Sequence, residues 1–303
     1  MIPAPSAPYI VTSPEAGLRL DAFLARRAGL GRRGARRLSI GARVNGRIAR
    51  PGQALAVGDS ITLVPSEALE GSLDCLRETS EILVLNKPAG LPTVALAGQA
   101  GDSMAARIAA ARPDGQWPGP PLESGIVHRL DAGTSGVLLV ARDERLWSEL
   151  RQQTRDRAWQ KTYLSLVQGR LDETQTVDLA IGQHPKSRRR MVPVRDPAKA
   201  ARYAAHSAFS RITPLRSDGA QTFVRVETRT GLRHQVRVHL ASIGHPVVND
   251  GLYGPPADDQ LPGHYLHGET IGWSDPASGS RIVERAPIPS WWPEWVRSSD
   301  DPI

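Results

Sequence analysis

The chain has 303 residues, of which 40% are hydrophobic and 23% are charged, and its formal net charge is +7. This composition excludes a disordered polypeptide, and the length allows one large domain and one small domain. The single cysteine, Cys75, excludes an internal disulfide framework and a cysteine-based zinc site, and no apolar run approaches membrane-spanning length. Because the first residues also lack the pattern of a secretory signal, we expect a cytoplasmic protein.

The N-terminal part of the chain has the pattern of a small α/β unit. Residues 1–14 are rich in proline, serine and alanine and are interpreted as a flexible lead-in, whereas residues 15–66 are expected to form a compact domain. A second, basic helix is expected near residues 32–40, and Asn45-Gly46 predicts a hairpin turn. A first helix is predicted by apolar residues at helical spacing: Leu20, Phe23 and Leu24.

Positive charge is concentrated in this N-terminal unit. Residues 15–50 contain ten arginines but only two acidic residues, Glu15 and Asp21, so the remainder of the chain is close to neutral. A GC-rich genome also raises arginine content, but it would spread arginine along the whole chain. The clustering therefore favours a phosphate-binding surface over a merely solvated helix. The arginines are Arg19, Arg26, Arg27, Arg32, Arg33, Arg36, Arg37, Arg43, Arg47 and Arg50.

Residues 67–74 are polar and are interpreted as a linker to a second domain, residues 75–303. ILVLNK and GVLLVA are apolar runs of strand length, and TFVRVETRT alternates as a strand does. The stretch after Asp143 has the pattern of a helix, with Leu146 and Leu150 on one face. This mixture predicts an α+β fold: a mixed, largely antiparallel sheet with helices on its faces.

The densest polar motif is HRLDAGTSG, residues 128–136, directly before the apolar run GVLLVA. Two glycines and two hydroxyl residues predict a tight turn, which would place Asp131 in a loop beside a rigid strand, where catalytic groups often lie. An aspartate in such a turn is also typical of an Asx-turn. The His-Arg-x-Asp order resembles a kinase catalytic loop, but the chain has no upstream glycine-rich nucleotide loop, which excludes a kinase.

Two further motifs have residue types suited to binding RNA. Tyr163, in Lys-Thr-Tyr, begins an expected strand and is suited either to packing or to stacking on a base. The third motif is TGLRHQVRVHL, residues 230–240, in which RHQVRVHL is expected to form a strand or a short helix. A strand would put Arg233, Gln235 and Arg237 on one face, where they could line an anionic cleft. The two histidines of this segment are five residues apart, a spacing that does not favour a metal site.

Taken in order, HRLDAGTSG, KTY and TGLRHQVRVHLASIGHPVVNDGLYG resemble the motifs of the RluA-type pseudouridine synthases. NKPAGLP, the basic segment IGQHPKSRRRMV and the closing LHGETIGWSDPASG fit the same family, so the resemblance covers about residues 73–297. In front of it, RLDAFLA, the basic helix and VNGRIARPGQALAVGDSI resemble the alpha-L RNA-binding domain. The resemblance implies a pseudouridine-synthase-like catalytic domain preceded by this small domain.

The resemblance also implies roles for individual residues. Asp131 would be the essential carboxylate, Tyr163 the ring that stacks on a flipped uracil, and Arg237 the cation that pairs with the aspartate. Arg129 would hold the RNA from which the base leaves. No cofactor or metal is implied, and the partner would be RNA, with ribosomal RNA favoured and transfer RNA possible. The candidate RNA-binding arginines of the N-terminal domain are Arg26, Arg32, Arg33, Arg36, Arg37 and Arg43.

Some points stay open at this level. Asp131 could attack C1′ as a nucleophile, or it could remove a proton from C2′ so that uracil leaves through a glycal. The chain departs from the family pattern at residues 91–94 (LPTV) and 232–235 (LRHQ), which affects the expected choice of substrate.

A non-catalytic RNA-binding or ribosome-assembly protein is an alternative. A serine hydrolase using Ser124 or Ser135 would lack the Gly-x-Ser-x-Gly motif. A monomer is the default expectation.

Overall fold

The computed structural model describes residues 8–28, 42–49, 52–63, 73–95, 102–111, 117–120 and 123–297. The chain forms two compact units, one from residues 1–73 and 94–124 and the other from residues 74–93 and 125–303. The expected second basic helix, with Arg32, Arg33, Arg36 and Arg37, lies outside the described residues. Within the described part, no helix is long and apolar enough to cross a bilayer.

The first unit contains a small sheet with the strand order β1-β4-β2-β3 and the helix α1, as expected from the spacing of its apolar residues. Phe23 and Leu24 of α1 are fully buried against Ile61 and its neighbours, and this cluster forms the core of the unit. Arg26 and Arg43 are exposed. The elements of this unit are β1 (Tyr9–Ile10), η1 (Ser13–Glu15), α1 (Leu20–Ala28), β2 (Ala42–Val44), β3 (Arg47–Ile48), β4 (Ser60–Leu63) and α3 (Met104–Ala111).

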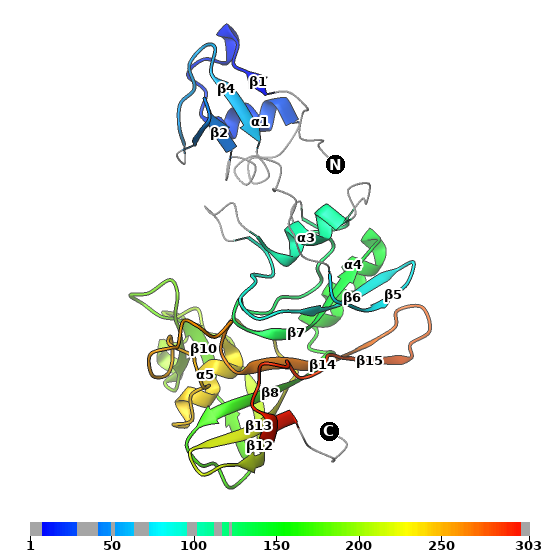
Figure 1. Cartoon of the computed structure of the whole chain (residues 1–303), viewed down its shortest axis with the longest axis vertical. Helices are drawn as coiled ribbons and strands as arrows, with labels where there is room; N and C mark the ends of the chain where they lie inside the picture. Colours follow the sequence, from blue (N-terminus) through cyan, green and yellow to red (C-terminus); the bar gives the residue numbers. More distant parts are fainter. Residues whose placement is uncertain are drawn as a thin grey trace. The chain divides into compact units, whose positions relative to one another are not determined.

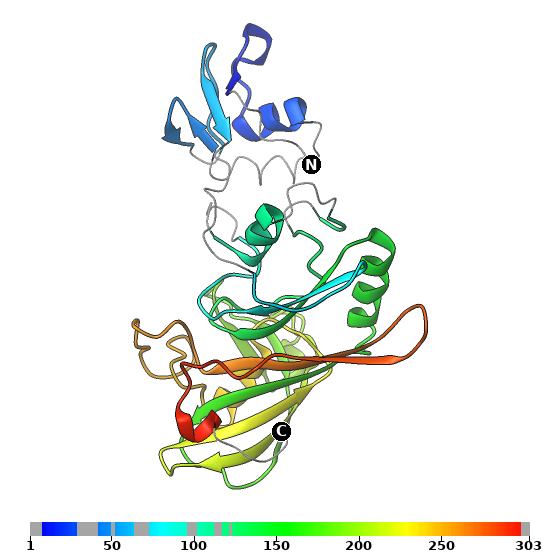
Figure 2. The same ribbon diagram turned by 45° about the vertical axis from the view of Figure 1, so that its right-hand side comes forward.

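The second unit is built on one large mixed sheet with the strand order β5-β6-β7-β14-β8-β13-β12-β9, and β15 pairs with β14 (Figures 1 and 2). All strand pairs in it are antiparallel except β7 with β14, which confirms the expected α+β class. Its strands are β5 (Cys75–Glu78), β6 (Ile82–Lys87), β7 (Ser135–Ala141), β8 (Gln160–Gln168), β9 (Gln175–Asp178), β12 (Phe209–Ser217), β13 (Gln221–Thr228), β14 (Leu266–Ser274) and β15 (Arg281–Arg285).

Helices and a two-stranded hairpin complete this unit. Leu146 and Leu150 of α4 pack with Val137 and Leu139 of β7, as the helical spacing predicts. Trp292 is buried against Phe223, so the tryptophan cluster near the C-terminus contributes to the core. The remaining elements are α4 (Glu144–Arg155), β10 (Ala180–Gln183), β11 (Met191–Val194), η2 (Pro197–Lys199), α5 (Gln235–Ser242) and α6 (Glu294–Arg297).

The helix α5 begins within RHQVRVHL, at Gln235, so the helix is confirmed among the two expected alternatives, and the strand face of Arg233, Gln235 and Arg237 does not form. In the sequence, valine alternates with polar residues, which suits a strand. In the structure, α5 is buried on all sides from Gln235 to Leu240, so the helix shows no polar face. Gln235 and Arg237 consequently point in different directions. The Gln235 amide bonds the β12 and β13 region through Phe209 O and Thr228 Oγ1, whereas Arg237 points to Asp131.

The contact between β7 and β14 is very close at one point. Gly136 lies opposite Gly268 with a φ of +126°, and a Cβ at residue 136 would lie 2.2 Å from the carbonyl oxygen of Gly268. Only glycine combines this φ with such a backbone approach. The glycine that ends HRLDAGTSG therefore lets β14 dock against the strand that follows Asp131.

Candidate active site

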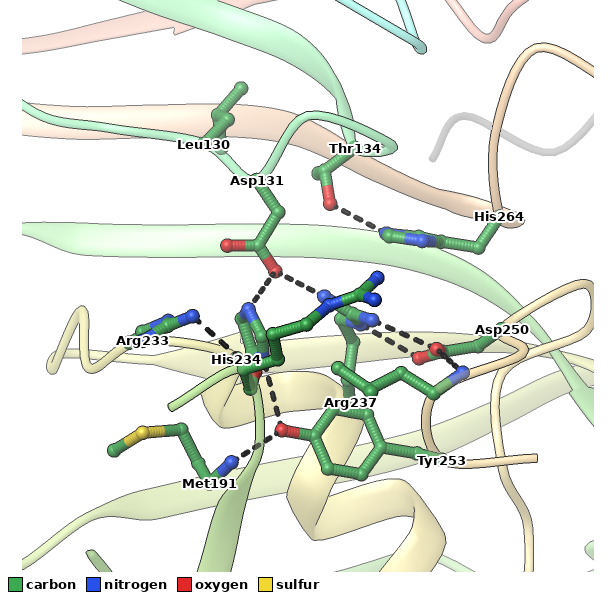
Figure 3. A network of polar contacts seen from close by, with 12 residues as sticks. Leu130, Asp131, Thr134, Met191, Arg233, His234, Arg237, Asp250, Tyr253 and His264 are labelled. Atoms are coloured by element: carbon green, nitrogen blue, oxygen red, sulfur yellow. Dashed lines mark hydrogen bonds and ion pairs between the residues drawn. The ribbon is translucent and has the colours of Figure 1, made fainter. Parts of the chain in front are cut away.

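The loop that carries Asp131 is fixed by hydrogen bonds from several elements. Thr134 Oγ1 lies 2.8 Å from His264 Nε2, and Ser135 Oγ lies 2.9 Å from His267 Nδ1 (Figure 3 shows the first of these contacts). The two hydroxyl residues of HRLDAGTSG thus tie the loop to the chain around the start of β14. These two contacts fix the position of the loop that carries Asp131.

A buried lysine holds the same loop from the other side. The Nζ atom of Lys87, at the end of β6, donates to the carbonyl oxygens of Pro88, Leu91 and Ala132 at 2.8, 2.6 and 3.1 Å. Burial lowers the pKa of Lys87 to about 7, while Asp131 acts in the opposite direction. Thr93 adds a second clamp, because its hydroxyl donates to Leu130 O and accepts from Leu130 N. The departure from the family pattern at LPTV therefore includes a residue that positions the neighbour of Asp131.

Asp131 is paired with Arg237 of α5, as the resemblance implied. Arg237 Nη1 donates to Asp131 Oδ2 at 2.8 Å. The same guanidinium donates from Nε and Nη2 to the two oxygens of Asp250, at 2.7 and 2.8 Å (Figure 3). Asp250 is almost completely buried, whereas the Asp131 side chain is 26% exposed. Arg237 is therefore fixed from behind by Asp250 and presents its remaining amino group to Asp131.

These charges keep Asp131 ionised. Burial on its own raises the pKa of the Asp131 carboxyl, but the charge of Arg237 and its hydrogen bond to Asp131 act in the opposite direction, and the net shift is downward. Burial lowers the pKa of His234 to about 4, so that this imidazole is neutral at pH 7 and Arg237 supplies the positive charge. Burial would also lower the pKa of Arg237, but hydrogen bonding to Asp250 raises it, so the guanidinium stays charged.

A hydrogen-bonded chain orients His234, which takes a left-handed conformation (φ +56°) just before α5. Met191 N–H donates to the Tyr253 hydroxyl at 2.8 Å, and that hydroxyl lies 2.8 Å from His234 Nδ1. With a neutral imidazole, a hydroxyl that donates to Nδ1 places the proton on Nε2, which lies 3.8 Å from Asp131 Oδ2. The Tyr253 ring also lies under Arg237, 5.1 Å from its guanidinium carbon.

A pocket of about 50 Å³ opens beside these groups. Arg129, Asp131, Tyr163 and Arg237 all line it, so the four candidate residues of the catalytic domain come together. Arg129 is exposed at its edge, and Tyr163 is half-buried on β8. Burial, followed by the charge of Asp131, raises the pKa of Tyr163, so its hydroxyl is neutral. Among the described residues, no three histidine, cysteine, aspartate or glutamate side chains gather as a metal-binding group.

Comparisons with known proteins agree with this geometry. A model of the RNA pseudouridylate synthase family matches residues 81–242, more than half of the chain. The chain belongs to this family. The matched region contains the segments that carry Asp131, Tyr163 and Arg237. The resemblance to RluA-type synthases is confirmed at the level of the family.

Two relatives show how far the likeness extends. The chain is 34% identical over 223 residues to an uncharacterised RNA pseudouridine synthase of Synechocystis, covering 72% of this chain and 66% of that protein. It is 34% identical over 226 residues to ribosomal large subunit pseudouridine synthase D of Nitrosomonas europaea, covering 72% and 62%. The matched part of the chain thus spans slightly less than two thirds of these relatives.

The fold has a counterpart among solved structures. Human RNA pseudouridylate synthase domain containing 1 superimposes with a TM-score of 0.58 at 21% identity, over 71% of this chain and 84% of the human chain. This likeness confirms the expected pseudouridine-synthase-like fold. The alpha-L resemblance of the N-terminal unit is a separate matter, because the family match begins at residue 81.

Sequence reasoning missed Asp250, Tyr253, His234 and Lys87 as parts of the site. Asp250 and Tyr253 belong to the motif NDGLYG, but no local pattern distinguishes a buried ion-pair partner from a turn residue. Lys87 belongs to NKPAG, where a lysine beside a proline and a glycine looks like an exposed turn residue. Its contact with Ala132 spans 45 residues, so only the fold reveals it.

Proposed function

We propose that this protein converts uridine to pseudouridine in structured RNA, with Asp131 as the catalytic carboxylate. The observation that supports this most directly is the fixed Asp131–Arg237–Asp250 arrangement beside Tyr163, in a chain of the pseudouridylate synthase family. The base leaves its stack and enters the pocket, which costs a few kcal/mol. Stacking on Tyr163 offsets about 1–3 kcal/mol of this cost.

The proposed reaction breaks the N1–C1′ bond, turns the base and joins C5 to C1′. Arg237 holds Asp131 through Oδ2, and Oδ1 accepts no hydrogen bond from any described residue, which leaves that oxygen for the substrate. It can attack C1′ directly or take a proton from C2′. Deuterium at C2′ separates the two routes: proton removal in the slow step gives a primary isotope effect on turnover, and direct attack gives a value close to one.

For the target, we propose a uridine in large-subunit ribosomal RNA, with transfer RNA as the alternative. The support is the likeness to the Nitrosomonas europaea relative, which is named a ribosomal large subunit pseudouridine synthase. We further propose that residues 15–66 form an alpha-L domain whose exposed arginines, including Arg26 and Arg43, contact phosphates. Next to the pocket, the hairpin of β10 and β11 presents exposed Lys186, Arg188 and Arg189 as a second cationic surface.

An RNA target places the protein in the cytoplasm, and a monomer is sufficient, since every site residue belongs to one chain.

The test uses RNA tritiated at uracil C5, isolated from cells that lack this gene. Formation of the C5–C1′ bond must expel that hydrogen, so tritium released to water counts turnovers. We expect release by the native protein and none by Asp131→Asn. Tight RNA binding without release by either protein would contradict the proposal and would favour a non-catalytic ribosome-assembly factor.

A further inference from the structure

Lys161, on β8, is a buried cation without a hydrogen-bond or ion-pair partner among the residues that the structure describes. The residue is 6% exposed, and its ammonium forms no hydrogen bond or ion pair with any described residue. Its one polar contact there is with the face of the Trp159 ring, at 5.7 Å. By contrast, Lys87, which is also buried, donates to three carbonyl oxygens. A buried charge normally has a partner because desolvation is costly, and this ammonium is free to take one from a bound molecule.

The position of Lys161 shows where that partner binds. Lys161 and Tyr163 are two residues apart on one strand, so they share a face and lie roughly 7 Å apart along it. Thr228, opposite Lys161 on β13, lines the pocket, and so does Gly231. A Cβ at Gly231 would lie only 2.7 Å from Lys161 Nζ. The ammonium thus occupies the space beside a pocket-lining glycine, next to the ring on which the base would stack.

We propose that Lys161 is a further catalytic residue, whose ammonium donates a hydrogen bond to a carbonyl oxygen of the flipped uracil. This inference rests on the proposed function. When the N1–C1′ bond breaks, its electron pair moves to the base, and negative charge spreads onto O2 and O4. A fixed cation stabilises that charge. No proton is transferred, and the electron density returns from the base when C5 bonds to C1′.

The base is a better partner for Lys161 than a backbone phosphate. The ammonium is withdrawn into the wall of the pocket that the base enters, whereas exposed arginines and Lys186 are available for phosphates. Burial lowers the pKa of Lys161 to about 8, so the amine remains mostly protonated at pH 7 and can donate.

The test compares the native protein with Lys161→Met on RNA tritiated at C5. We expect the single-turnover rate to fall by about 10²–10³-fold, as for other transition-state donors. The Kd for RNA should stay within about twofold. The melting temperature should be unchanged or higher, because the change removes an unpaired buried charge. The matched control is Lys199→Met, an exposed lysine paired with Asp196, which should leave all three quantities unchanged.

A second measurement identifies the contacted oxygen. RNA with sulfur in place of O2 or O4 of the target uridine offers a weaker hydrogen-bond acceptor. Sulfur at the contacted position should slow the native protein, and it should not slow Lys161→Met further. If Lys161→Met does not fold, Gly231→Ala is used in its place, because the added methyl group displaces the ammonium while Lys161 remains. Gly231→Ala should slow turnover, and sulfur at the contacted oxygen should not slow it further.

Other results would overturn the inference. An unchanged rate in Lys161→Met, with the native protein active, would remove Lys161 from the reaction and leave the proposed function intact. A parallel loss of affinity and rate would indicate a phosphate contact instead. A lower melting temperature together with equal sulfur effects in both proteins would indicate a structural lysine. Absence of tritium release by the native protein would overturn the proposed function, and this inference with it.

Discussion

The Asp131 carboxylate and the Arg237 guanidinium meet at 2.8 Å, but the arginine is held more firmly by Asp250 than by Asp131. A bidentate pair with a buried carboxylate fixes the plane of the guanidinium, which a single contact with Asp131 could not do. The guanidinium that faces Asp131 is therefore held in place by Asp250. Arg237 is in this sense a positioning residue for the carboxylate.

Replacement of Arg237 tests this arrangement. In Arg237→Met we expect turnover to fall by about 100-fold or more, with the Kd for RNA little changed, because the guanidinium faces two protein carboxylates. We also expect a loss of about 3–5 kcal/mol in the free energy of unfolding, since Asp250 is left buried and unpaired. Tritium release, RNA binding and urea unfolding measure the three effects. Arg155→Met, on the exposed face of α4, is the control, and equal losses of affinity and turnover would contradict the assigned role.

At the scale of elements, the docking of β14 against β7 depends on Gly136. Gly136→Ala introduces a methyl group that would lie 2.2 Å from the Gly268 carbonyl oxygen, at a φ that alanine disfavours. We expect a loss of about 3 kcal/mol or more in the free energy of unfolding, together with loss of activity. Gly279→Ala is the matched control, because it shares the positive φ but meets no atom within 4 Å. It should cost about 1 kcal/mol. Equal effects in thermal or urea unfolding would show that close approach at Gly136 is unimportant.

Strand-length apolar runs predicted β6 and β7, and the spacing of Leu146 and Leu150 predicted α4, because each pattern reports one buried face. Such spacing does not identify α5, because this helix is buried on all sides and has no polar face. The candidates Asp131, Tyr163 and Arg237 could be found from the sequence, because each lies within a short motif of neighbouring residues. The Asp250 partner and the Lys87 clamp could not, because their contacts depend on how distant strands and loops meet.

At the scale of the whole molecule, several buried histidines predict sensitivity to acid. Burial lowers the pKa of His234, His264 and His267 to about 4, and lowers that of His128 as well. In the unfolded chain these groups bind protons near their ordinary pKa of 6.5. Between pH 6.5 and 4 the unfolded state binds more protons than the folded state, so stability falls as the pH falls. Urea unfolding at pH 7.5, 5.5 and 4.5 measures this loss, and constant stability across that range would contradict it.

Salt dependence tests the proposed RNA surface of the N-terminal unit. If Arg26 and Arg43 neutralise phosphates, Arg26→Gln and Arg43→Gln should each weaken RNA binding. Each should also reduce the slope of log K against log salt by about 0.7–0.9. The measurement is a series of RNA-binding titrations at salt concentrations between about 50 and 200 mM, where phosphate contacts strongly affect affinity. Arg145→Gln on α4 is the control, since this exposed arginine pairs with Glu149. Unchanged slopes would argue against phosphate contacts at both positions.

The order of strands in the large sheet has a consequence for synthesis of the chain on the ribosome. β14 is translated after every other segment that lines the pocket, yet it inserts between β7, which follows Asp131, and β8, which carries Tyr163. Its first residue, Leu266, is itself part of the pocket wall. A nascent chain that ends before Leu266 therefore holds both residues without the strand that spaces them. Activity should appear only after β14 has left the exit tunnel, so a nascent chain that still holds β14 inside the tunnel should not modify RNA.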